Sequence, residues 1–155
     1  MSSLRSAVSV VMLDIDGFKA INDRVGHLAA DRVLAAIGGR LKDVLRISDV
    51  RGRFGGDEFL IVLPDTPPAG ALHVAEALRH EIESLRVAVE DGIEATTASV
   101  GVATSGPDEL EADPLVTRAD RALYKAKRAG RNRVEVADPP PVMQIEQQPP
   151  VRRVS

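Results

Sequence analysis

The 155-residue sequence has no cysteine and no tryptophan, and its only aromatic residues are Phe18, Phe54, Phe59 and Tyr124. Without cysteine, the chain can form no disulfide, thiolate metal site or cysteine nucleophile. With so few aromatics, the core must consist of Val, Leu, Ile and Ala. No apolar run approaches the roughly 18 residues of a membrane-spanning helix, and the N-terminus lacks a signal-peptide pattern. These absences predict a cytoplasmic protein without a membrane segment.

Neither sign of charge dominates. Lys and Arg total 20 against 23 Asp and Glu, a net charge of −3, while 44% of residues are hydrophobic. This balance is typical of one globular domain and argues against nucleic acid or an anionic membrane as a partner. Five of the ten prolines lie in the last 18 residues. We therefore expect a folded domain over 1–137 and a flexible, proline-rich tail over 138–155.

Strand-like and helix-like patterns alternate along the folded part. Strands are expected at 7–13, 49–54, 59–63, 86–89, 95–103 and 132–137, and helices at 18–25, at 28–45, after Pro68, and at 114–129 with Gly130 as the C-terminal cap. This order predicts an α/β (α+β) fold of the split βαβ, ferredoxin-like type, whose mostly antiparallel sheet carries helices on one face. The first strand is almost continuously apolar, which is typical of a strand buried on both faces.

Acidic residues gather beside glycines at two predicted strand ends. Asp14 and Asp16 follow the first strand, and Asp57 and Glu58 lie in the turn of the central hairpin. If that strand pairs with the hairpin, Asp14 and Asp57 converge, and converging carboxylates bind a cation or have raised pKa values. Oxygen ligands suit Mg²⁺ or Mn²⁺. Either motif alone also fits an ordinary turn, but the two together favour a metal site.

A cationic cluster lies at the end of the last predicted helix. Lys127 and Arg131 are four residues apart, so they are expected on one helix face, and Lys125, Arg128 and Arg133 surround them. The cluster fits a phosphate clamp opposite the metal site. It also fits a solvated helix end that complements the helix dipole, and on these residues alone the second interpretation is favoured.

Residues 53–63 read RFGGDEFLIVL and resemble the signature hairpin of the GGDEF family of diguanylate cyclases. Further family motifs are matched by LDIDGFKAIND at 13–23, by Gly26, His27 and Asp31, and by segments at 99–103, 119–127 and 130–132. Order and spacing agree from about residue 7 to residue 137. The chain is thus identified as a member of this family, whose fold is similar to the palm of nucleotidyl cyclases and polymerases.

Family members condense two GTP molecules, one on each subunit of a homodimer, into cyclic di-GMP with release of pyrophosphate. The resemblance implies that Asp14, the carbonyl of Ile15 and Asp57 hold two Mg²⁺ (or Mn²⁺) ions, and that Asp57 and Glu58 are catalytic, with Glu58 near the attacking 3′-hydroxyl. The resemblance also implies the substrate-binding residues. Asn22 and Asp31 would bind the guanine, and Gly55 and Gly56 would lie along the nucleotide. The phosphates would be bound by the backbone N–H groups of Gly17, Phe18 and Lys19 and by the side chains of Lys127 and Arg131.

Arg46 and Asp49 match the RxxD motif that binds the product and inhibits the enzyme in this family. Alternatively, the two residues are an arginine at a helix end and an aspartate in the following turn, with no role in product binding. A further arginine that often completes the product pocket falls, by counting, at Ala77. Asp16 and His27 also match motif positions, and for both we expect a structural role.

The sequence departs from the family pattern at its start. GGDEF domains usually open with a helix and an Asp-x-Leu-Thr segment, whereas only Met1 to Ser6 precede the first strand here. We therefore expect weakened dimerisation. The alternative to an enzyme is a catalytically silent module that binds GTP or cyclic di-GMP.

Overall fold

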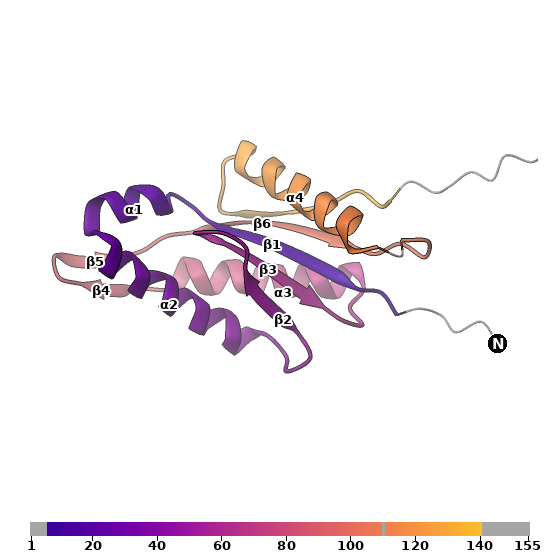
Figure 1. The fold of residues 1–155 in the computed structure, drawn as a ribbon, viewed down its shortest axis with the longest axis horizontal. Coiled ribbons are helices and arrows are strands. Elements are labelled where there is room, and N and C mark those ends of the chain that lie inside the picture. The colour runs from indigo at the N-terminus through magenta and orange to yellow at the C-terminus, as the bar shows by residue number, and fades with distance from the viewer. Residues whose placement is uncertain (1–5, 110, 141–155) are drawn as a thin grey trace, which may run out of the picture.

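The computed structural model describes residues 6–109 and 111–140. Within them, a five-stranded sheet is flanked by helices, and a small two-stranded hairpin stands apart from it (Figure 1). In chain order the elements are β1 (Ser9–Ile15), α1 (Phe18–Val25), α2 (His27–Val44), β2 (Val50–Arg53), β3 (Glu58–Leu63), α3 (Pro68–Ser84), β4 (Val87–Val89), β5 (Gly92–Glu94), β6 (Ala98–Thr104), α4 (Ala112–Arg128) and β7 (Arg133–Val136). Of the predicted tail, only 138–140 fall within the described residues.

The strand order of the main sheet is β2-β3-β1-β6-β7. β1 pairs antiparallel with both β3 and β6, β2 pairs antiparallel with β3, and β7 runs parallel to β6. The predicted α+β fold with a mostly antiparallel sheet is confirmed. Every residue of β1 is buried, as its continuous apolar run predicted, because this strand lies at the centre of the sheet.

Helices cover both faces of the sheet, so the prediction of a single covered face is wrong (Figure 1). Val11 and Leu13 of β1 face the cluster that contains the apolar residues of α2 and α3. Val10 and Met12 pack on the other face against α4, including Leu123. Since successive strand residues point to opposite faces, a strand that is apolar at every position requires cover on both sides.

The packing of α4 on β6 depends on one glycine. A Cβ atom added at Gly101 would overlap the backbone of Ala119 and Leu123 in α4. The helix can therefore approach the sheet this closely only because Gly101 has no side chain.

Two boundaries differ from the sequence prediction. The strand predicted at 95–103 begins later in the structure, because β6 starts at Ala98, and a short strand that was not predicted, β5, ends at Glu94 and pairs with β4. β1 continues two residues beyond the predicted end, because Asp14 and Ile15 are still paired with neighbouring strands. Among the described helices, none combines the length and the apolar character needed to cross a bilayer.

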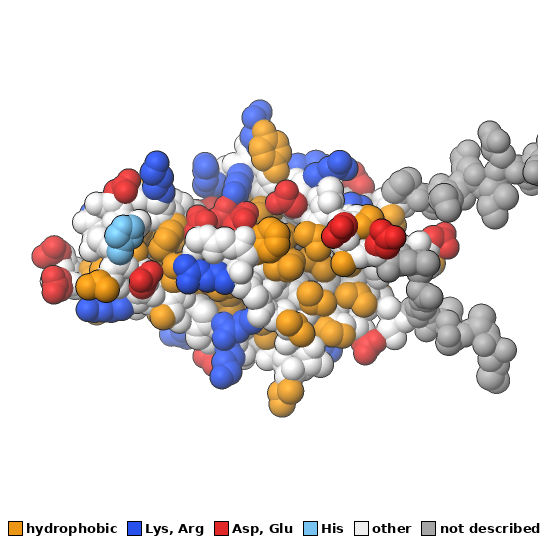
Figure 2. Space-filling model, in the orientation of Figure 1, with side chains coloured by type: hydrophobic (Ala, Val, Ile, Leu, Met, Phe, Trp, Pro, Cys, Tyr) orange, Lys and Arg blue, Asp and Glu red, His pale blue; other side chains and the backbone are white. Residues whose placement is uncertain are grey.

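An apolar groove of about 560 Å³ lies at one end of the sheet, beside the first turn of α4. Its walls include Val8 and Val10 of the β1 region, Leu60 and Val62 of β3, and Leu115 of α4. Hydrophobic side chains are correspondingly visible on this face (Figure 2). The groove lies at the opposite end of β1 from the acidic residues described next.

Candidate active site

Pairing of β1 with β3 brings the two acidic motifs together. Asp14 lies opposite Glu58 in the antiparallel register, and the N–H of Ile15 donates to the carbonyl of Asp57 at 3.1 Å. Asp14 is two residues beyond Met12, so its side chain points to the α4 face. The predicted convergence of Asp14 with the hairpin acids is confirmed.

Lys127 of α4 lies against these carboxylates. Its Nζ forms an ion pair with Oδ2 of Asp14. Partial burial lowers the pKa of Lys127, but the hydrogen bond to Asp14 and the charges of Asp14, Glu58 and Asp57 outweigh burial and raise this pKa above its ordinary 10.5. Acidic side chains stand beside basic ones near the end of α4 (Figure 2). Lys127 therefore contacts the acidic cluster and is not simply a solvent-exposed lysine at a helix end.

Asp14 has the properties expected of a metal ligand. Its Oδ1 atom is buried without a hydrogen-bond partner. Burial, opposed by Lys127 and reinforced by Asp57, raises the pKa of Asp14 from its ordinary 3.8 to about 6. A cation at Oδ1 would supply the missing partner and favour the ionised form. The donor set fits a hard divalent ion.

Side chains alone do not complete such a metal site. Within residues 6–109 and 111–140, no three His, Asp or Glu side chains are grouped in a way that could hold an ion. An ion here would need further ligands from the backbone, water or bound phosphate. Mg²⁺ commonly uses such mixed sets with one or two carboxylates.

The chain turns sharply between β1 and α1. Gly17 adopts a left-handed conformation (φ 65°), and α1 starts at Phe18 with no side chain capping its first turn. The N–H groups of this turn are therefore available to an anion. Lys19 in the same turn is exposed, whereas Phe18 packs partly against the core.

The hairpin turn between β2 and β3 is open at Gly56. A Cβ atom added there would meet no protein atom within 4 Å, and the residue has no left-handed φ. Arg53 holds this turn by donating to the carbonyl of Gly56 at 2.9 Å. Packing within the described residues therefore gives no reason for glycine at this position, which leaves space for a ligand.

Arg131 lies beyond the end of α4, as the predicted helix cap at Gly130 implies. α4 ends at Arg128, and Gly130 follows with φ 122°. The N–H of Arg131 then donates to the carbonyl of Ala126 at 3.0 Å, which is typical of a glycine-based helix end. Arg131 itself is left-handed (φ 64°), so it does not share a helix face with Lys127 as predicted. The reversal of the chain at Gly130 sets its position.

The two residues predicted at the guanine lie on adjacent helices. Asn22 is half-buried in α1, and Asp31 is exposed in α2. Gly26, with φ 82°, separates the two helices. His27 is exposed at the first position of α2, so it does not contribute to the core.

A sequence profile described as "Diguanylate cyclase, GGDEF domain" matches residues 2–133. The chain belongs to the GGDEF family. It is 38% identical over 133 residues to diguanylate cyclase A of Treponema denticola, covering 86% of this chain and 36% of that protein. It is 43% identical over 128 residues to diguanylate cyclase DgcP of Pseudomonas aeruginosa, covering 83% and 19%. The chain thus spans about a third or less of these two proteins.

Solved GGDEF-family structures have the same fold. The active GGEEF domain of a diguanylate cyclase from Vibrio cholerae superposes with a TM-score of 0.80 at 35% identity, covering 86% of this chain and 84% of that one. The GGDEF domain of DgcB from Caulobacter crescentus, solved in complex with c-di-GMP, gives a TM-score of 0.79 at 33% identity, covering 84% and 78%.

The RxxD motif of this GGDEF domain is engaged in internal contacts. Arg46 donates to Asp49 at 3.1 Å, to the carbonyl of Pro64 at 3.0 Å and to the hydroxyl of Thr66 at 2.8 Å. The Asp49 side chain is only 1% exposed, whereas that of Arg46 is 55% exposed. Ala77, the position counted for a third product-binding arginine, carries no donor. The motif thus ties the start of β2 to the loop before α3.

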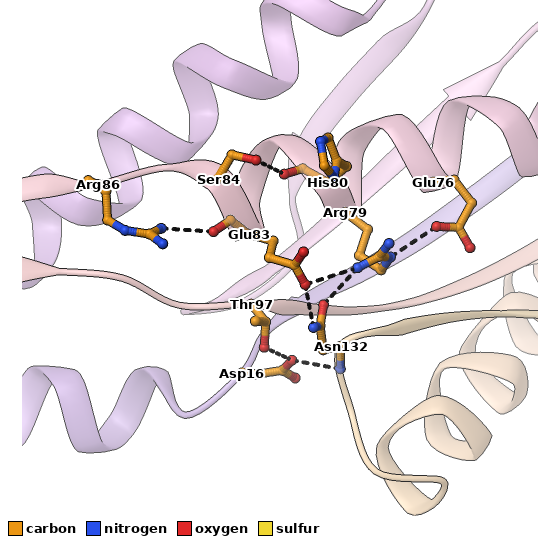
Figure 3. Close-up of polar contacts among 9 residues, drawn as sticks. All are labelled: Asp16, Glu76, Arg79, His80, Glu83, Ser84, Arg86, Thr97 and Asn132. Atoms are coloured by element: carbon orange, nitrogen blue, oxygen red, sulfur yellow. Dashed lines mark hydrogen bonds and ion pairs between the residues drawn. The ribbon is translucent and has the colours of Figure 1, made fainter.

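A polar network that the sequence pattern did not indicate surrounds Asp16 of the GGDEF domain (Figure 3). Asp16 was expected to be structural, and it accepts hydrogen bonds from Thr97, Ser99 and the backbone of Asn132. The burial of Ser99 in β6 is complete. A serine within an otherwise apolar strand was the available signal, because a buried hydroxyl needs a polar partner.

Proposed function

We propose that this chain condenses two molecules of GTP into one cyclic di-GMP with release of two pyrophosphates, as a homodimer in which each subunit presents one GTP. The observation that carries the proposal is the cluster of Asp14, Asp57, Glu58 and Lys127, with one buried Asp14 oxygen lacking a partner. Such a cluster has the donors for a cation and for phosphate at one place. The names of the relatives agree with this activity.

Asp14, the carbonyl of Ile15 and Asp57 would hold Mg²⁺ or Mn²⁺. Bound ions of this kind neutralise the triphosphate and polarise the phosphorus that is attacked. In the structure Lys127 forms an ion pair with Asp14. Because the Lys127 side chain is 33% exposed, its Nζ can move from the carboxylate to a phosphate oxygen when a cation binds Asp14.

The phosphates would be bound from two sides. The uncapped N–H groups of Gly17, Phe18 and Lys19 lie at the N-terminus of α1, where backbone donors and the helix dipole both favour an anion. Lys127 and Arg131 would contribute the opposing positive charges. Two separate segments of the chain would thus hold one triphosphate, which fixes the α-phosphate relative to the carboxylates.

The guanine would lie against α1 and α2, with Asp31 accepting hydrogen bonds from the N–H edge of the base and Asn22 completing the recognition. The half-buried amide of Asn22 and the exposed carboxylate of Asp31 suit a ligand that approaches from solvent. Gly55 and the open space at Gly56 would let the nucleotide lie against the backbone. A carboxylate acceptor selects guanine over adenine, whose corresponding edge lacks the N1–H and the 2-amino group.

Glu58 would accept the proton of the attacking 3′-hydroxyl. It starts β3, directly opposite Asp14, and is half-buried, so it lies beside the proposed metal ligands without being sealed from a substrate. Removal of this proton makes the 3′-oxygen a better nucleophile towards the α-phosphorus of the GTP on the other subunit.

Product inhibition at Arg46 and Asp49 would require an exchange of partners. Arg46 must release Asp49, Pro64 and Thr66 before both residues can contact a guanine of cyclic di-GMP. This requirement predicts weaker inhibition than a site with free side chains would give.

The test is to incubate the purified chain with GTP and Mg²⁺ at low and high protein concentration and to separate the products by chromatography. We expect cyclic di-GMP to form more than linearly with protein concentration, because two subunits must meet. The Asp57→Ala variant should form none while keeping the circular dichroism spectrum of the wild type. Asp108→Asn, an exposed substitution at the far end of the sheet, is the matched control. GTP binding without product would instead indicate a silent binding module, and an equally active Asp57→Ala protein would contradict the proposal.

A further inference from the structure

The carboxylate of Asp16 connects three separate segments of the chain (Figure 3). Its Oδ2 accepts from the hydroxyl of Thr97 at 2.6 Å and from the backbone N–H of Asn132 at 3.1 Å, and its Oδ1 accepts from the hydroxyl of Ser99 at 2.7 Å. Its backbone N–H donates to the carbonyl of Thr97 at 2.9 Å. Asp16 is therefore fixed at both its main chain and its side chain.

The contact with Asn132 reaches the turn that carries Arg131. Arg131 and Asn132 are consecutive non-glycine residues in the left-handed region, with φ of 64° and 45°. This conformation is unfavourable for most side chains, although asparagine tolerates it better than others. The hydrogen bond from the N–H of Asn132 to Asp16 compensates for this conformation and fixes the direction in which the turn leaves α4.

The side chain of Asn132 is held from the other side by α3 (Figure 3). Its Oδ1 accepts from Arg79 at 3.0 Å, and its Nδ2 donates to Glu83 at 2.5 Å. Arg79 also pairs with Glu83 at 3.2 Å and with Glu76 at 3.0 Å. Both polar ends of the Asn132 amide are used, so the turn is anchored to the sheet by Asp16 and to α3 by this second set of contacts.

Asp16 also lies between the two parts of the proposed site. It directly follows Ile15 of β1 and directly precedes Gly17, whose left-handed φ starts the phosphate-facing turn of α1. The turn at Arg131 and Asn132 approaches from the end of α4, which carries Lys127. One carboxylate thus sets the distance between the N-terminus of α1 and the cationic end of α4.

We propose that Asp16 is a positioning residue that holds Arg131 in place for the triphosphate by fixing the backbone of Asn132 against the end of β1. The inference rests on the proposed function, because it assumes that Arg131 contacts phosphate. Asp16 itself touches neither substrate nor metal in this proposal. Its effect on nucleotide binding passes through the turn that it anchors.

The proposal predicts non-additive effects on nucleotide binding. The probe is 3′-deoxy-GTP with Mg²⁺, which lacks the attacking hydroxyl and so reports binding without turnover; its dissociation constant is measured by calorimetry. We expect Asp16→Asn and Arg131→Ala each to weaken binding about tenfold, and the double variant to bind no more weakly than Arg131→Ala alone. Asp108→Asn should bind like the wild type. Losses that multiply in the double variant would overturn the proposal.

A second measurement needs no nucleotide. Amide hydrogen exchange of the metal-free protein should show faster exchange at Arg131 and Asn132 in Asp16→Asn, with unchanged rates in the centre of β1. Unchanged exchange at Asn132 would overturn the proposal even if GTP binds normally. If the wild type does not bind 3′-deoxy-GTP, the proposed function fails, whereas the exchange measurement still tests whether Asp16 holds the turn. The two failures are therefore distinguishable.

Asn132→Gly is the second variant should Asp16→Asn not fold. Glycine keeps the backbone donor and the left-handed conformation but removes the contacts with Arg79 and Glu83. We expect faster exchange at Arg131 and weaker binding of 3′-deoxy-GTP, again without further loss when combined with Arg131→Ala. Wild-type exchange and affinity in Asn132→Gly would contradict the role of the turn.

Discussion

Asp14→Asn should stabilise the metal-free protein and abolish its activity. The folded state raises the pKa of Asp14 from 3.8 to about 6. At 1.36 kcal/mol per pKa unit, this corresponds to a penalty of about 3 kcal/mol for the ionised carboxylate. Asparagine imitates the neutral form, and its amide can donate to the neighbouring Asp57. For a domain of this size, the gain at pH 8 corresponds to a rise in Tm of roughly 6–12 °C.

The effect should depend on pH in one direction. In the unfolded chain Asp14 loses its proton near pH 3.8, whereas the folded state retains it until about pH 6. Between these values the folded state binds more protons, so the free energy of unfolding falls as pH rises. The stability difference between Asp14→Asn and the wild type should therefore be small at pH 4 and reach its full size above pH 6.

Urea denaturation with a chelator present, at several pH values from 4 to 8, measures this difference. Asp108→Asn, exposed and far from the site, is the control and should show no such trend. Added Mg²⁺ should then stabilise the wild type but not Asp14→Asn, since ligands stabilise the state that binds them. A variant less stable than the wild type at pH 8, or a difference independent of pH, would refute this reasoning.

Three further substitutions test other parts of the domain. Arg46→Ala should weaken cyclic di-GMP binding in calorimetry with little change in initial rate. It should also lower the free energy of unfolding by about 1 kcal/mol, because Thr66 and its loop lose a half-exposed donor. Unchanged product affinity would disprove the product site. Gly101→Ala should destabilise the fold by at least about 3 kcal/mol, since its Cβ overlaps the backbone of α4. Gly39 is exposed in α2, and no atom lies near a Cβ added there. Gly39→Ala should therefore stabilise the fold by about 0.5–1 kcal/mol. Similar denaturation curves for Gly101→Ala and Gly39→Ala would contradict the packing argument.

Local patterns predicted most elements of this fold. Phe18–Val25 is a helix over the predicted range, and the glycine turn between β2 and β3 was visible as a hairpin. The end of β1 was misplaced because Asp14 and Ile15 are held by partners on two neighbouring strands. Pairing of this kind depends on residues far away in the sequence, so polarity alone could not indicate it.

The positions of the acidic residues in the candidate site could be predicted from the sequence, whereas the positions of the basic residues could be predicted only in part. Carboxylates beside glycines at strand ends are recognisable, and pairing of two strands brings them together. The position of Arg131 depends instead on the chain reversal at Gly130 and on the contact between Asp16 and Asn132, which are 116 residues apart. No periodic pattern in the sequence indicates such a contact. The spacing of four residues therefore wrongly predicted that Lys127 and Arg131 share a helix face.

The central position of β1 has a consequence for how the chain folds during synthesis. β1 ends at Ile15, whereas its second partner strand is complete only at Thr104, about 90 residues later. At roughly 5–20 residues per second, β1 emerges roughly 5–18 s before that partner is made. β1 must therefore wait on the ribosome with one edge unpaired, where it is exposed to aggregation and to chaperones. The continuous burial that secures the finished domain makes its early synthesis the most vulnerable stage.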